Sequence, residues 1–196
     1  MGMNVYGLIS WWFRKCRITI TISLLILVFG IVVGLMFWPM FKGFEEDLVK
    51  KFSGLKPFTL EMFSSILINN LTILYLWITV GGITLVLPYV VLLVNAIILG
   101  SFAGLIHFEY GISPQLIAML IVPHGVFELT AIIMGVTCST VLWLNLWRVT
   151  LKRIKFGEIV SDITTSLKLL VLATLILVLA AFIETFITPL FYVLFH

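Results

Sequence analysis

Residues Met62 to Ile106 read MFSSILINNLTILYLWITVGGITLVLPYVVLLVNAIILGSFAGLI, a run of 45 residues without a charged side chain. A helix needs about 20 apolar residues to cross a bilayer, so this run is too long for one crossing. Gly81-Gly82 and Pro88 lie near its middle, and residues of these types favour a turn. We therefore predict two membrane spans with almost no loop between them, near 62–82 and 86–107. The pattern leaves open whether Gly81-Gly82 forms a hairpin or a break inside the bilayer.

The whole chain has the composition of a membrane protein. Of its 196 residues, 62% are hydrophobic and 11% are charged, whereas soluble domains carry about 45–50% and about 25%. So few charges cannot cover a soluble fold, and the net charge of +3 does not indicate nucleic-acid binding. Cys16 and Cys138 are isolated thiols, which form neither a disulfide framework nor a metal motif.

Three further apolar runs complete the predicted spans, near 18–41, 114–144 and 167–189. The first is longer than the core of a signal peptide and lacks a small-residue cleavage site, so we expect a retained helix. Trp11, Trp12 and Phe13 just before it suit an interfacial aromatic belt. The predicted fold class is an all-α, polytopic transmembrane helix bundle of five spans, forming a single integral membrane domain over residues 1–196 in the cell membrane.

Charged residues gather between the spans and predict the orientation of the chain. With the N-terminus inside and the C-terminus outside, eight basic residues face the cytoplasm and four face the opposite side, as the positive-inside rule favours. We interpret two charged segments, 42–61 and 147–163, as amphipathic connectors. Each either lies along the lipid headgroups or docks a partner.

Six polar side chains inside the apolar spans form the candidate site. An ionisable side chain at the centre of a membrane helix costs about 2.5–3.5 kcal/mol on insertion scales and usually faces the bundle interior. At about 1.5 Å per residue, all six fall within one slab of the outer half of the bilayer. We predict an intramembrane polar cluster of Asn69, Asn70, Asn95, His124, Glu128 and Glu184.

The ionisable members of this cluster suggest a metal site. His124 and Glu128 are four residues apart and share one helical face, so they can hold one cation. Glu184 would complete a set of ligands for zinc or another divalent metal, although the chain lacks an HExxH motif. Two alternatives remain: a hydrogen-bonded polar core in which Glu128 is protonated or pairs with His124, and a proton or solute path.

Two pairs of glycines mark helix-packing faces. Gly30 and Gly34 in the first span, and Gly100 and Gly104 in the third, each form a GxxxG motif. Such pairs let helices approach closely. They therefore pack spans either within one chain or between copies in a homo-oligomer.

Short elements across about residues 60–190 carry a resemblance to a known family. They are PHGVFEL at 123–129, AFIETFITP at 181–189, Asn69-Asn70, Gly81-Gly82 with Thr84, and Asn95 with Gly100. Together they resemble the stage II sporulation protein M family, polytopic membrane proteins of bacteria and archaea. Ala96 departs from the family, which tends to have glycine after the asparagine.

The resemblance implies a scaffold role more than an activity. The namesake anchors and localises a membrane complex with cell-wall-degrading partners during engulfment, but most relatives occur in organisms that form no spores. The family's polar positions map onto the six residues of the predicted cluster. We therefore expect a non-enzymatic scaffold or assembly factor with membrane or cell-envelope protein partners. The alternatives are a zinc-dependent intramembrane enzyme and a transporter or proton relay, both using His124, Glu128 and Glu184.

Overall fold

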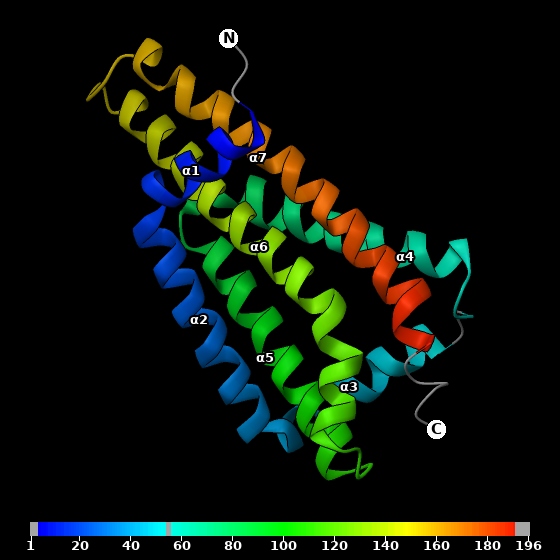
Figure 1. Ribbon diagram of the computed structural model, residues 1–196. Coiled ribbons are helices and arrows are strands. Elements are labelled where there is room, and N and C mark those ends of the chain that lie inside the picture. Colours follow the sequence, from blue (N-terminus) through cyan, green and yellow to red (C-terminus); the bar gives the residue numbers. More distant parts are fainter. Residues whose placement is uncertain (1–3, 54–55, 191–196) are drawn as a thin grey trace.

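The computed structural model describes residues 4–53 and 56–190, and of residues 48–53 the backbone alone. These residues form helices and no strand (Figure 1). Five of the described helices are long and apolar enough to cross a membrane, which confirms the predicted fold class. They are α2 (Arg17–Met36), the helix of α4 (Leu60–Thr72), η1 (Ile73–Val80) and η2 (Gly81–Thr84), α5 (Leu87–Phe108), α6 (Pro114–Thr150), and α7 (Phe156–Phe182) with η3 (Ile183–Ile187) to Leu190. The orientation across the membrane stays a prediction.

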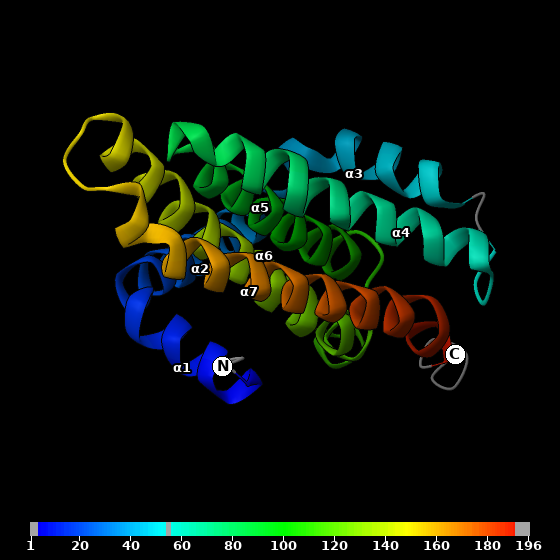
Figure 2. The same cartoon turned by 90° about the horizontal axis from the view of Figure 1, so that it is seen from above.

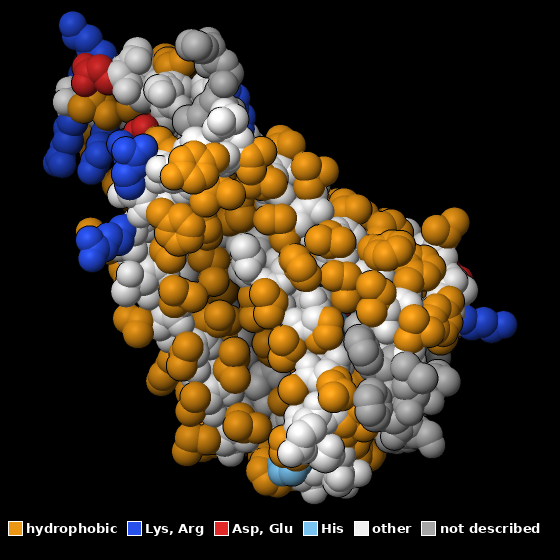
Figure 3. Space-filling model, in the orientation of Figure 1, with side chains coloured by type: hydrophobic (Ala, Val, Ile, Leu, Met, Phe, Trp, Pro, Cys, Tyr) orange, Lys and Arg blue, Asp and Glu red, His pale blue; other side chains and the backbone are white. Residues whose placement is uncertain are grey.

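The spans pack as neighbouring pairs. α2 lies along α5 and α6 lies along α7 (Figure 1), while α4 runs beside α7 (Figure 2). α3 (Trp38–Ser53) packs against α5 near the end of the bundle where α7 ends. On the face shown in Figure 3, hydrophobic side chains cover most of the helices and Lys and Arg lie at the ends. This is the surface that a hydrocarbon layer between two aqueous phases requires.

Three of the four motif glycines, Gly30, Gly34 and Gly100, join α2 to α5 within the chain, and Gly104 lies against Trp38 of α3. A Cβ on Gly30 would lie 2.6 Å from the Cβ of Ala96, and a Cβ on Gly100 would lie 2.9 Å from the carbonyl carbon of Ile31. Gly34 is equally close to the backbone of α5. The two motifs are therefore occupied by packing inside one chain, and homo-oligomerisation stays a prediction without their support.

The long uncharged run turns at Gly81-Gly82, so the hairpin alternative describes it better than a break within one span. The helix widens to π geometry in η1, tightens to 3-10 geometry in η2, and ends at Leu85, whose φ of 60° is left-handed. Such changes leave carbonyl oxygens without helical partners. Three α6 side chains spaced four residues apart supply donors, from Ser139 to Ile78 (2.8 Å), from Trp143 to Thr79 (2.6 Å) and from Trp147 to Ile83 (2.9 Å).

The predicted connector at 147–163 is wrong as a separate surface helix. α6 continues to Thr150 and α7 begins at Phe156, where the Glu158 carboxylate accepts a hydrogen bond from the Lys155 backbone N–H (3.2 Å). α6 has 37 residues, about 55 Å at about 1.5 Å per residue, and exceeds the hydrocarbon core of about 30 Å. The charges of this segment thus lie on the ends of α6 and α7 and in the turn between them, because a helix has no need to end at the membrane surface.

The first predicted span also ends earlier than expected. α2 stops at Met36 instead of residue 41, and Phe37 separates it from α3. Pro39 lies in the first turn of α3, where its missing N–H is tolerated, whereas within a continuous helix it would break the hydrogen bonding. The first part of the predicted connector at 42–61 is therefore helical, and it belongs to a helix that begins earlier, at Trp38.

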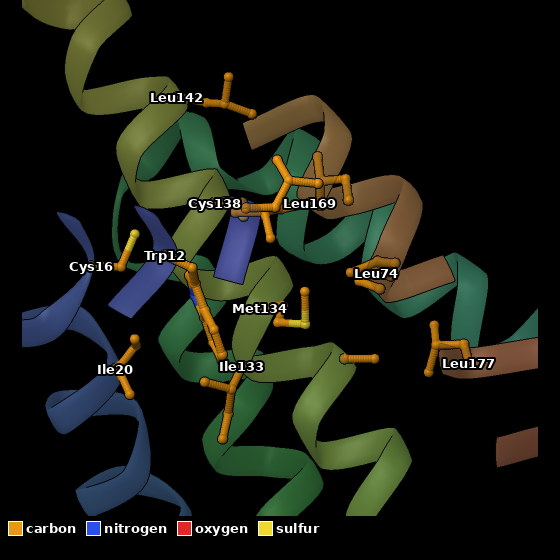
Figure 4. Packing of buried hydrophobic residues seen from close by; sticks show 14 residues of the cluster. Trp12, Cys16, Ile20, Leu74, Ile133, Met134, Cys138, Leu142, Leu169 and Leu177 are labelled. Atoms are coloured by element: carbon orange, nitrogen blue, oxygen red, sulfur yellow. The ribbon is translucent and has the colours of Figure 1, made fainter. Parts of the chain in front are cut away.

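The N-terminal helix α1 (Val5–Lys15) packs against the bundle through two buried side chains, Leu8 and Trp12. Trp12 is buried among residues of α6 and α7 (Figure 4), and its indole N–H donates to Thr137 Oγ1 (2.6 Å). The interfacial placement predicted for Trp12 is therefore wrong. Cys16 and Cys138 are buried in the same cluster as free thiols.

Candidate functional site

All six polar residues predicted to cluster line one pocket of about 470 Å³. Asn69 and Asn70 come from α4, Asn95 from α5, His124 and Glu128 from α6, and Glu184 from η3. A seventh polar residue, Glu45, reaches the same pocket from α3. The six residues predicted from their depth therefore lie together in space, and their function stays a prediction.

The helices are irregular where they meet the pocket. The N–H of Ile73, where α4 gives way to π-helical η1, donates to the carbonyl oxygens of both Asn69 and Asn70. Glu184 lies inside a second π-helical segment, η3, and Pro123 interrupts the hydrogen bonding of α6 directly before His124. π segments inside helices occur frequently at functional sites, so the backbone supports the same location as the side chains.

The amides and the histidine make local hydrogen bonds. Asn69 donates to Asn70 Oδ1 (3.3 Å) and Asn95 donates to the carbonyl oxygen of Val91 (2.9 Å). The Nδ1 atom of His124 pairs with Thr188 Oγ1 (3.3 Å), with the proton placed according to the tautomer. Among the described residues no hydrogen bond or ion pair joins His124 to Glu128, and Thr188, just after η3, is the partner of His124 instead. The alternative of a protonated Glu128 stays a prediction.

The two carboxyl groups of the spans have no such partners. Within the described part of the chain, neither Glu128 nor Glu184 makes a hydrogen bond or an ion pair, although each interacts electrostatically with the other. Both side chains are half-buried, and a fully buried polar group without a hydrogen bond would cost about 1–3 kcal/mol. The pocket thus holds two acidic groups whose bonding capacity the fold does not use.

Glu45 was not among the predicted site residues. It is 2% exposed, and its carboxylate accepts a hydrogen bond from Ser101 Oγ on α5. Burial raises the pKa of this carboxyl above its ordinary value, and the bond from Ser101 lowers it by less. One signal was present in the sequence: Glu46 and Asp47 each have a lysine four residues later, whereas Glu45 is followed at that spacing by Val49.

An ion pair attaches α3 to the end of α5. Lys42 Nζ lies 2.6 Å from Glu109 Oε1, with both side chains more than a third exposed. Exposed pairs contribute only about 0–1 kcal/mol. The burial of Glu45 therefore determines the position of α3 over the pocket more than this ion pair does.

The predicted metal ligands line the pocket without forming a recognisable metal centre. Within residues 4–53 and 56–190, no group of three or more His, Cys, Asp and Glu side chains is placed to hold a metal ion. Zinc binding by His124, Glu128 and Glu184 therefore stays a prediction.

The fold and the pocket define a multi-pass membrane protein with a polar site inside its helix bundle. The sequence model described as Stage II sporulation protein M matches residues 22–189, so the chain belongs to that family. It is 29% identical over 175 residues to an uncharacterized protein of Methanocaldococcus jannaschii, an alignment that covers 88% of this chain and 95% of that protein. No solved structure matches the chain.

Proposed function

We propose that this protein is a non-enzymatic scaffold or assembly factor of the cell membrane that acts by binding a partner at the pocket and α3. The pocket carries the proposal: seven polar side chains from five separate elements meet there, and two of its carboxyls are unpaired in the described part of the chain. An ionisable residue inside a membrane indicates function by default, because it costs stability. Binding explains why that cost is tolerated.

α3 extends the proposed binding site to the membrane surface. It lines the pocket through Phe44 and Glu45, and it leaves Met40 80% exposed and Phe44 51% exposed. An amphipathic helix outside the spans is accessible to a cell-envelope protein. A partner on α3 therefore also lies beside the pocket that α3 lines. The resemblance to a namesake that anchors a membrane complex supports the same role.

Photocrosslinking in cells tests this proposal. A photoreactive residue at Met40 is compared with one at Leu25, which is 65% exposed on α2. We expect defined protein partners from position 40 and lipid alone from position 25. Glu128→Gln with Glu184→Gln should reduce the protein crosslinks about tenfold, the effect of losing about 1.4 kcal/mol of binding free energy. Equal crosslinks from both positions, or crosslinks that ignore the double substitution, would contradict the proposal.

A proton or solute relay is the second candidate function. The electrostatic proximity of Glu128 and Glu184 favours it, because relays through membranes use neighbouring acidic groups. Proton flux into liposomes measures this activity directly. A Glu128→Gln variant with the flux of the unmodified protein would exclude a relay through these carboxyls and leave the scaffold proposal intact.

A further inference from the structure

We infer that the pocket binds an amphiphilic small molecule with a protonated amine, its ammonium group beside Glu128 and Glu184 and its apolar part against Phe44 and Phe102. The inference rests on the proposed function, because it names the ligand class of the same pocket. It follows from the charge, the bonding capacity, the apolar lining and the size of the site.

The charge of the lining favours a cationic ligand. Three carboxyls line the pocket, and its described lining includes neither Lys nor Arg. The remaining basic group is His124, whose Nδ1 is already paired with Thr188. Two carboxylates close together in a medium of low dielectric repel each other, and a positive group between them stabilises both.

The bonding pattern favours an ammonium over a metal ion. Metals such as zinc need about four ligands at fixed distances, and the described residues offer no group of three suitable ligands. An ammonium group has three donors that rotate freely to meet acceptors. The oxygens of Glu128 and Glu184, which accept no hydrogen bond from the described residues, are acceptors of that kind.

The rest of the lining fits an apolar body. Ten of the seventeen lining residues are hydrophobic or glycine, including Phe44 and Phe102. The volume of about 470 Å³ lies within the range of about 300–1,000 Å³ that is usual for small-molecule sites. A phospholipid headgroup fits less well, because its phosphate would be placed among three carboxyls.

The lining joins a helix outside the membrane spans to the interior of the bundle. Glu45 lies on α3, which is not among the five membrane-capable helices, and Glu128 lies within α6. A ligand that fills the pocket therefore contacts both the proposed docking helix and the unpaired carboxyls.

Equilibrium binding of radiolabelled 2-phenylethylamine to the full chain in phosphatidylcholine nanodiscs tests the inference. We expect saturable binding at one site per chain.

Two competitors test the ligand class. Competition by unlabelled 2-phenylethanol, which has the same shape without the charge, should be at least about tenfold weaker than competition by the unlabelled amine. Replacing part of the lipid by phosphatidylethanolamine should leave binding unchanged. Non-saturable binding, equal competition by the alcohol, or displacement by the lipid would each overturn the inference without any variant.

Two matched substitutions locate the site. Glu128→Gln and Glu184→Gln should each weaken amine binding at least about tenfold, whereas Glu158→Gln, at an exposed carboxyl in the first turn of α7 outside the pocket, should leave it unchanged. Retained affinity in both pocket variants would overturn the inference.

The two readouts separate this inference from the proposed function. Partner crosslinks that depend on Glu128 without amine binding would refute the ligand class alone. Amine binding with crosslinks that ignore Glu128 would refute the scaffold role alone.

Discussion

Two regions of the helix bundle hold half-buried acidic groups in different ways. Near α1, the Asp162 carboxylate accepts a hydrogen bond from Asn145 (3.2 Å) and pairs with Lys15 (2.9 Å). In the pocket, Glu128 and Glu184 have no partner of either kind among the described residues. A paired acid contributes to the fold, whereas an unpaired one costs stability. The difference separates the structural polar residues of this protein from those available to a ligand.

A pair of glycine substitutions, one at buried Gly82 and one at exposed Gly43, should show the largest effect. A Cβ on Gly82 would lie 2.6 Å from Trp143 Cδ1, while a Cβ on Gly43 in α3 would have nothing within 4 Å. Gly82→Ala should destabilise the protein by about 1–3 kcal/mol through overpacking. Gly43→Ala should stabilise it by up to about 1 kcal/mol, because alanine is the better helix former. SDS unfolding measures both, and two changes of the same sign would contradict this contrast.

Trp12 tests how strongly α1 is fixed to the bundle. Trp12→Phe removes the hydrogen bond to Thr137 and part of a buried ring. A lost buried bond plus the smaller side chain should cost about 2 kcal/mol. Trp11→Phe, a matched change one residue earlier at a partly buried position, should cost less than half as much in the same thermal unfolding assay. Equal losses would mean that general packing, and not this bond, holds α1.

The pattern of apolar runs predicts the spans well because a bilayer imposes a length on every crossing. It could not place the ends of α6 and α7, since beyond the bilayer that constraint no longer applies. Trp12 was misplaced for a related reason: an aromatic residue beside a span suits both an interface and a core, and only the contact with Thr137 decides. The six polar residues were located together because depth follows from helical rise. Glu45 lies outside the spans, where depth gives no information.

Neutralising one acid in each region should change stability in opposite directions. Asp162→Asn weakens the pairing with Lys15, which is half exposed, and should cost about 1 kcal/mol. Glu184→Gln removes one of two neighbouring carboxylates and should leave the protein equally stable or more stable by up to about 1 kcal/mol. Thermal unfolding of the two variants at neutral pH measures the difference. A clear loss of stability in Glu184→Gln would show that the fold uses this carboxyl after all.

The smallest expected effect concerns Glu45, which combines features of both regions because it is buried beside the pocket and bonded to Ser101. Its pKa is raised in the folded protein, chiefly by burial, so the folded state binds its proton more tightly than the unfolded state does. Stability from this group is therefore complete below the ordinary glutamate pKa of about 4.3 and is lost as the pH rises through the raised value.

Glu45→Gln cannot titrate and should lack this dependence on pH. Melting temperatures of both proteins across this interval measure the effect. A wild-type protein that gains stability relative to Glu45→Gln as the pH rises would mean that the bond from Ser101 outweighs burial, and that Glu45 belongs with Asp162 among the paired acids.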